Sequence, residues 1–250
     1  MPSVEERSPV TTVLIPAHNE TATIRKVVEG ALAHIDHVLV ISDGSTDGTV
    51  AALEGLPVEI QDHAENLGKG LRLAQGIALA EARGARAVLT LDADGQHDPD
   101  DIPAFLAAAA ASPEALVIGE RTKDRAAMPF GRAASIRFGD FFISWGAGRQ
   151  LRDAQCGMRL YPSSLWRRVT VPPAECRHFT FETAVLMRAG EAGIPFSRVD
   201  IRARYEGYVQ RPSHYRPAID TLRIVGVVAS FLLRRGLRPR ALLIALGILR

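Results

Sequence analysis

Short apolar runs rich in β-branched residues recur through the first half of the chain, at residues 10–15, 37–41, 57–60, 87–91 and 115–118. Between several of these runs, apolar residues return every three or four positions, as in Ile24, Val27, Val28, Ala31 and Ile35, and again in Leu71, Ala74 and Ala78. The runs predict buried strands, and the spacing predicts helices that each bury one face. Alternating strands and helices predict an α/β fold with a mostly parallel sheet covered on both faces.

Three of the predicted strands end in polar, turn-rich segments: IPAHNE at 15–20, SDGSTDGT at 42–49 and DADGQH at 92–97. In open α/β sheets, ligands bind beyond the carboxyl ends of the strands, so these segments should converge on one site. Pro16 is expected to end its strand, and a helix should start near Asp100, because Pro103 is tolerated only in a first turn. For Asn19 two interpretations stay open, a helix cap or a ligand contact.

Negative charge is concentrated after the fourth run, where Asp92, Asp94 and Asp98 fall within seven residues. Carboxylates this close repel one another unless a cation lies between them. The segment is therefore either a solvated turn or a site for a hard divalent cation, Mg²⁺ or Mn²⁺, bound together with substrate phosphates. A calcium loop is excluded, because its sixth and twelfth positions would be His97 and Pro103.

Two glycine-containing segments also suggest binding chemistry. Asp43, followed by Gly44 and Ser45, places a carboxylate beside backbone amides, which suits a base or ribose edge but is also ordinary turn composition. In ENLGKG, Lys69 can meet a phosphate. The pattern GxxxxGK[ST] is absent because Gly70 follows the lysine, so ATP hydrolysis by a phosphate-binding loop is not expected.

Composition narrows the class of protein. A net charge of +2 and 6% aromatic residues give no indication of a nucleic-acid partner. The two cysteines form no CxxC pair, which favours a reducing, cytoplasmic compartment. Residues 1–9 contain no apolar segment of signal-peptide length and are interpreted as a short leader.

The order and spacing of IPAHNE, SDGSTDGT, NLGKG and LDADGQHDP resemble the nucleotide-sugar-binding half of family 2 glycosyltransferases of the GT-A fold. The later QCGMR and FET segments resemble that family's acceptor-side motifs, and the resemblance extends from about Val10 to Tyr215. It implies a Rossmann-like sheet with helices on both faces, a nucleotide-sugar half at 10–120 and an acceptor half at 121–220. It also implies an inverting, metal-dependent transferase similar to the polyprenyl-phosphate sugar transferase branch, with a UDP or GDP sugar as donor.

The resemblance also implies roles for individual residues. Nucleotide-sugar contacts are carried over to Pro16, Ala17, Asn19, Glu20, Asp43, Ser45, Lys69, Asp92 and Ala93. The implied metal ligands are Asp92, Asp94 and Gln96; the implied catalytic residues are Asp94, Glu182 and Asp153; the implied phosphate or acceptor contacts are Arg159, Arg211 and His214. Glu182 and Asp153 are the candidates for the general base that an alcohol acceptor requires and an anionic phosphate acceptor does not.

The chain departs from the family pattern at two places. Family members often have FETE where this chain has Ala184 after FET, which leaves Glu182 as the better base candidate. The polyprenyl-phosphate branch often has Ser-Lys where this chain has Ser213 and His214. The alternatives to a lipid-linked acceptor are a soluble or polysaccharide acceptor and an inactive scaffold that only binds a nucleotide sugar.

Residues 221–250 contain six arginines, no acidic residue and two apolar runs, at 224–233 and 241–249. Each run is about half of the roughly 18 apolar residues that a membrane span needs. The pattern is typical of helices at a membrane interface, with arginines at anionic headgroups, or of helices docked on the protein's own core. The membrane interpretation predicts a peripheral enzyme at the cytoplasmic face of the membrane, with a lipid-linked acceptor such as a polyprenyl phosphate.

Overall fold

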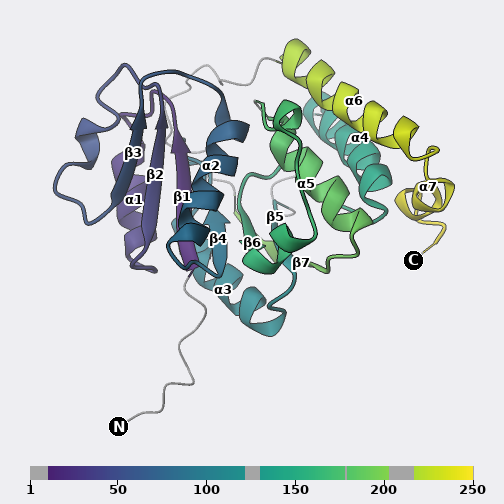
Figure 1. Ribbon diagram of the computed structural model, residues 1–250, viewed down its shortest axis with the longest axis horizontal. Helices are drawn as coiled ribbons and strands as arrows, with labels where there is room; N and C mark the ends of the chain where they lie inside the picture. The colour runs from purple at the N-terminus through teal and green to yellow at the C-terminus, as the bar shows by residue number, and fades with distance from the viewer. Residues whose placement is uncertain (1–10, 122–129, 178, 203–216, 250) are drawn as a thin grey trace, which may run out of the picture.

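The computed structural model, shown in Figure 1, describes residues 11–121, 130–177, 179–202 and 217–249. Its strands are β1 (Thr11–Ala17), β2 (Val38–Asp43), β3 (Glu59–His63), β4 (Ala87–Thr90), β5 (Leu116–Glu120), β6 (Arg159–Pro162) and β7 (Phe196–Asp200). Its α-helices are α1 (Ile24–Leu32), α2 (Lys69–Ala82), α3 (Ile102–Ala111), α4 (Phe130–Ala147), α5 (Thr180–Glu191), α6 (Pro217–Arg234) and α7 (Pro239–Ala245). The five strands expected from the apolar runs are present.

The described strands form one seven-stranded sheet in the order β3-β2-β1-β4-β6-β5-β7. Every pair is parallel except those of β6, which runs antiparallel between β4 and β5. The apolar runs predicted no strand beyond residue 118, yet β6 and β7 follow. Since β6 is only four residues long and buried on both faces, its sequence shows no alternation that could have revealed it.

Helices cover both faces of the sheet, as Figure 1 shows. Leu14, Leu39 and Val88 point to the face packed by α2, α4 and α5. The neighbouring residues Val13 and Leu89 point to the face packed by α1 and α3. This alternation follows from the two-residue repeat of a strand and gives the two apolar cores that hold the loops beyond β1, β2 and β4 in place.

Helix α2 forms where it was predicted, and two of the three residues expected on its buried face pack half-buried against the core, whereas the third does not. Leu73 and Ile77 are buried, whereas Ala78 is exposed. Gly76 accounts for the orientation, because a Cβ at this position would lie 2.5 Å from the Leu14 side chain. The glycine allows the helix to approach β1 closely, and that approach brings the start of α2 to the end of the sheet.

Two expectations about proline had different outcomes. Pro16 does not end β1, which continues to Ala17. Because pairing with β4 covers only Thr11 to Leu14, the missing N–H of Pro16 breaks no ladder on that side. Pro103 does lie in the first turn of α3, after a short 3₁₀ turn in which Asp98 Oδ1 accepts a hydrogen bond from the Asp100 N–H at 3.1 Å.

The C-terminal helices pack on the protein with one face and expose the other. Helix α6 contacts α4 and α5 and buries Phe231 and Leu232, while Leu222 and Leu233 on its outer face are 70% and 69% exposed. The Arg235 guanidinium lies 3.9 Å from the Phe231 ring and pairs with Glu191 at the end of α5. Among the described residues, no helix combines the length and the apolar character that crossing a bilayer would require.

Candidate active site

The loops that follow β1 and β2 are joined by hydrogen bonds. The Asn19 N–H donates to Ser45 Oγ at 3.1 Å, and Asn19 Oδ1 accepts from the Thr46 N–H at 2.8 Å. The Glu20 N–H donates to Thr49 Oγ1 at 2.8 Å. Asn19 therefore does not cap α1; it links the IPAHNE and SDGSTDGT segments, which converge as predicted.

Asp43, at the end of β2, fixes the segment that leads into α2. Its buried carboxylate accepts hydrogen bonds from the Leu67 and Gly68 N–H groups, both at 2.8 Å, and from Arg72 Nε at 2.7 Å. Arg72 also donates to the Glu65 carbonyl at 2.6 Å. Sequence reasoning missed Arg72, although an arginine on the buried side of an amphipathic helix was a usable signal. That Asp43 reads the base stays a prediction.

Lys69, the first residue of α2, lies between two carboxylates that are far apart in the sequence. Its Nζ lies 2.7 Å from Asp92 Oδ1 and 3.5 Å from Glu182 Oε1. Burial would lower the pKa of Lys69, but the charges of Asp92 and then Glu182 raise it well above its usual value. The lysine is thus a fixed cation between the segment after β4 and the first turn of α5.

The two aspartates after β4 differ electrostatically. Burial would raise the pKa of Asp92, but Lys69 and His97 lower it to about 2. Burial and the neighbouring charge of Asp92 raise the pKa of Asp94, whose Oδ1 accepts one hydrogen bond, from the Gln96 N–H at 2.9 Å. A cation beside Asp94 would offset both the burial of its charge and the repulsion from Asp92.

The donor set at this turn fits a hard divalent cation. Two carboxylates and the Gln96 amide provide oxygen ligands, which Mg²⁺ and Mn²⁺ prefer. Within the described part of the chain, no group of three or more His, Cys, Asp or Glu side chains is placed to hold a metal by itself. A cation that takes one or two carboxylates, with substrate phosphates as the remaining ligands, does not need such a group.

Two residues, His97 and Gly157, contact Asp92 and fix its position. The Asp92 N–H donates to Nδ1 of the buried His97 at 3.3 Å. Gly157 lies against the carboxylate, because a Cβ there would be 2.5 Å from Asp92 Oδ2. His97 therefore acts as a support within the turn, and only glycine fits at position 157 without displacing Asp92.

Glu182 and Asp153, the two base candidates, occupy different environments. Glu182 lies in the first turn of α5, beside Lys69, and is 7% exposed. Asp153 is buried and held by Arg121, with Nε–Oδ2 and Nη2–Oδ1 distances of 2.7 and 2.8 Å. Ala184, where the family often has a second glutamate, is fully buried. Glu182 therefore contacts the group that contains Lys69 and Asp92, whereas Asp153 pairs with Arg121.

Arg159 lies elsewhere than predicted. It was expected to contact a phosphate, but its guanidinium is 1% exposed and donates to the carbonyls of Cys156, Glu182 and Ala154 at 2.8, 2.9 and 2.6 Å. Arg211 and His214, the other two predicted phosphate or acceptor contacts, lie outside the described residues. Pro16, Ala17 and Ala93 lie at or just beyond the ends of β1 and β4.

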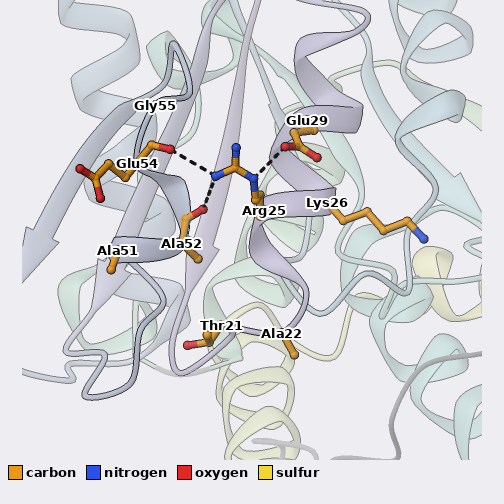
Figure 2. Close-up of a pocket in the computed structure, with 9 residues that line it drawn as sticks. All are labelled: Thr21, Ala22, Arg25, Lys26, Glu29, Ala51, Ala52, Glu54 and Gly55. Atoms are coloured by element: carbon orange, nitrogen blue, oxygen red, sulfur yellow. Dashed lines mark hydrogen bonds and ion pairs between the residues drawn. The ribbon is translucent and has the colours of Figure 1, made fainter.

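A separate cavity of about 690 Å³ lies between α1 and the 3₁₀ turn at Ala51–Leu53, shown in Figure 2. Arg25 is at its centre and donates to Glu29 and to the carbonyls of Ala52 and Glu54, at 2.9, 3.0 and 3.2 Å. None of the predicted site residues lines it. The candidate site is therefore the group at the ends of β1, β2 and β4, not this cavity.

The mostly parallel sheet, with polar loops at the carboxyl ends of β1, β2 and β4, agrees with the GT-A fold that the resemblance predicted. Comparison with known families agrees. The chain belongs to the family described as Glycosyl transferase family 2, whose model matches residues 12–168. It is a glycosyltransferase, as the resemblance in its motifs predicted.

Similar named proteins support the assignment to the glycosyltransferases. The chain is 26% identical to UDP-N-acetylglucosamine–dolichyl-phosphate N-acetylglucosaminyltransferase of Methanococcus voltae, over 78% of this chain and 86% of the relative. It is also 26% identical to polyprenol monophosphomannose synthase of Mycolicibacterium smegmatis, over 76% and 75%. Among solved structures, glucosyl-3-phosphoglycerate synthase of Mycobacterium tuberculosis, in complex with Mn²⁺, UDP and glucosyl-3-phosphoglycerate, superposes with a TM-score of 0.63 at 20% identity, covering 91% and 80%.

Proposed function

We propose that the protein is an inverting, metal-dependent glycosyltransferase that moves a sugar from a nucleotide-diphosphate sugar to a lipid-linked phosphate. The observation that carries this proposal is the position of Lys69 between Asp92 and Glu182. One cation links the carboxylate beside the donor loops to a carboxylate on the acceptor side. Donor and acceptor groups are therefore close enough to serve one displacement reaction.

On the donor side, Asp92, Asp94 and Gln96 would hold Mg²⁺ or Mn²⁺. When bound, the metal supplies Lewis-acid stabilisation of the departing nucleoside diphosphate. Solved structures of the same fold were determined with UDP and Mn²⁺ or Mg²⁺, which supports the proposal. The Asn19, Glu20, Asp43 and Ser45 loops would orient the nucleotide, and Lys69 would lie beside its phosphates.

On the acceptor side, Glu182 is the proposed general base or charge partner. A direct displacement inverts the anomeric carbon, and the attacking oxygen must lose any proton it carries. An acceptor phosphate, with a second pKa near 6, is largely deprotonated already at neutral pH. Glu182 would accept the remaining proton and keep Lys69 directed at Asp92. Asp153, held by Arg121, is the weaker candidate.

A lipid-linked acceptor is supported by the names of the relatives, which include a dolichyl-phosphate N-acetylglucosaminyltransferase and a polyprenol monophosphomannose synthase. The outer surface of the C-terminal helices supports the same acceptor. Exposed apolar residues continue along α6 and α7 and beyond, at Ile219, Leu222, Val225, Leu233, Leu237, Leu243, Leu246, Ile248 and Leu249. We term this set the apolar stripe. Exposed arginines flank it, including Arg223 and Arg234, as expected for an interfacial helix on anionic lipid.

The donor class can be tested directly by thermal denaturation. UDP, GDP and dTDP sugars should be compared, each with Mg²⁺, with Mn²⁺ and with neither. One nucleotide class should raise the melting temperature in the presence of metal, because a ligand at 100 times its Kd stabilises the folded state by about 2.7 kcal/mol. Absence of a shift with every donor would contradict a nucleotide-sugar site.

Membrane contact can be tested with the double variant L222E/L233E. Both side chains point away from the core, so the fold should be retained, while two buried charges would oppose insertion into lipid. We expect at least a tenfold loss of binding to vesicles that contain anionic lipid, measured by sedimentation. The matched control A104E/A107E adds the same charges to the exposed side of α3 and should bind as the wild type does. Equal binding by both variants would rule out the apolar stripe as the contact surface.

A further inference from the structure

Arg159 is among the largest fully buried side chains of the protein, yet none of its described hydrogen bonds goes to a carboxylate. It begins β6, directly opposite Thr90 of β4, in the middle of the sheet. A buried charge is costly unless hydrogen bonds satisfy it, and here three main-chain carbonyls do so. An arginine in this position acts through the segments whose carbonyls it binds.

Two of these carbonyls, Ala154 and Cys156, belong to the segment that approaches the donor side. The next residue, Gly157, lies against the Asp92 carboxylate. The Gly157 carbonyl also accepts a hydrogen bond from Thr90 Oγ1 at 2.7 Å, which attaches the segment to β4. Arg159 therefore holds the segment that packs against the Asp92 carboxylate.

The third carbonyl is that of Glu182. Its side chain reaches Lys69 at 3.5 Å, and Lys69 in turn contacts Asp92 at 2.7 Å. The main chain that carries Glu182 and the main chain that packs on Asp92 are thus bound to the same guanidinium. Three donors of a planar guanidinium keep a fixed geometry that the single ammonium of lysine cannot reproduce.

We propose that Arg159 is a positioning residue that sets the separation between the Asp92 and Glu182 carboxylates. This inference rests on the proposed function, in which those two groups serve the donor and the acceptor. Arg159 touches neither substrate. It fixes the first turn of α5 relative to the turn after β4, so its loss should change turnover more than donor binding.

The test compares R159K with L165A. Leu165 is a fully buried core residue outside the site, so its truncation supplies a matched loss of stability. We expect R159K to lower kcat at least tenfold with donor KM within a factor of two, and L165A at a similar melting temperature to keep kcat within a factor of two. A kcat no lower in R159K than in L165A, or a donor KM that rises in proportion to the loss, would overturn the proposal.

Two further measurements keep the proposal testable if R159K folds poorly or the activity is absent. In a crystal structure of R159K, the separation between the Asp92 and Glu182 carboxylates should differ from that in the wild type; an unchanged separation would overturn the positioning role even if transfer is never detected. G157A acts on the other end of the same connection and should displace Asp92 and lower kcat, and wild-type kinetics in G157A would overturn the role assigned to this segment. Absence of donor binding by the wild type would instead refute the proposed function alone.

Discussion

Replacing Asp94 with alanine should lower sugar transfer at least a thousandfold while the protein remains folded. Asp94 is a partly buried carboxylate whose pKa is raised by burial and by Asp92, so its ionised form is held in place only at a cost. A divalent cation bound at the site would offset this cost by stabilising the ionised carboxylate. Removing the ligand would remove the charge stabilisation of the leaving diphosphate, and stabilisation by one fixed charge or donor is commonly worth two to three powers of ten or more in rate.

The measurement is kcat for transfer, together with nucleotide binding by calorimetry with and without metal. Metal should tighten nucleotide binding in the wild type and have little effect in D94A. The matched control is D98N in the same turn, since Asp98 Oδ1 accepts a hydrogen bond from the Asp100 N–H and the asparagine oxygen can also accept it. Full transfer by D94A, or by the wild type in excess chelator, would exclude a metal-dependent mechanism.

Glu182→Gln should lower kcat about a hundredfold while donor KM changes less than threefold. Glutamine keeps the size of the side chain but removes the charge that faces Lys69 and the capacity to accept a proton. General-base contributions typically amount to a factor of 10² to 10⁴. Because Glu182 lies in α5, away from the loops after β1 and β2, donor binding should be largely spared.

The control for this substitution is Glu191→Gln, at the other end of the same helix, where the glutamate pairs with Arg235. It should reduce stability slightly and leave kcat within a factor of two. The pH dependence of kcat separates the two roles proposed for Glu182. If E182Q loses less than fivefold and keeps the wild-type pH profile, then the acceptor supplies its own charge and Glu182 serves only as an ion-pair partner.

The meeting of the polar loops at one edge of the sheet could be predicted from the sequence because the signals for it are local. Polar segments follow apolar runs at β1, β2 and β4, and parallel strands bring their carboxyl ends to one edge. The pairing of Asn19 with the loop after β2 could not be predicted, since an asparagine before a helix is equally suited to capping. The geometry excludes the cap, because Asn19 Oδ1 accepts from the Thr46 N–H, 27 residues away, and the ligand contact stays a prediction.

The contacts of Glu182 and Arg159 were harder to predict because they are long-range. Lys69 and Glu182 are 113 residues apart, and no sequence periodicity connects them. Arg159 was misassigned for a related reason: the resemblance of its segment to an acceptor-side motif implied a phosphate or acceptor contact, whereas β6 inserts the side chain into the sheet, where it donates to main-chain carbonyls. Gly157 could have been noticed only with the position of Asp92 known.

The antiparallel insertion of β6 between β4 and β5 also has a consequence for folding. A strand from beyond residue 150 must enter the sheet before β5 and β7 can attach, so central pairing depends on segments distant in sequence. Proteins dominated by such contacts fold slowly, because the chain loses the entropy of loop closure before the strand pairs form and stabilise it. We therefore expect the two parts of the sheet on either side of β6 to fold as one unit, and the proposed reaction centre to be completed only after β6 has paired.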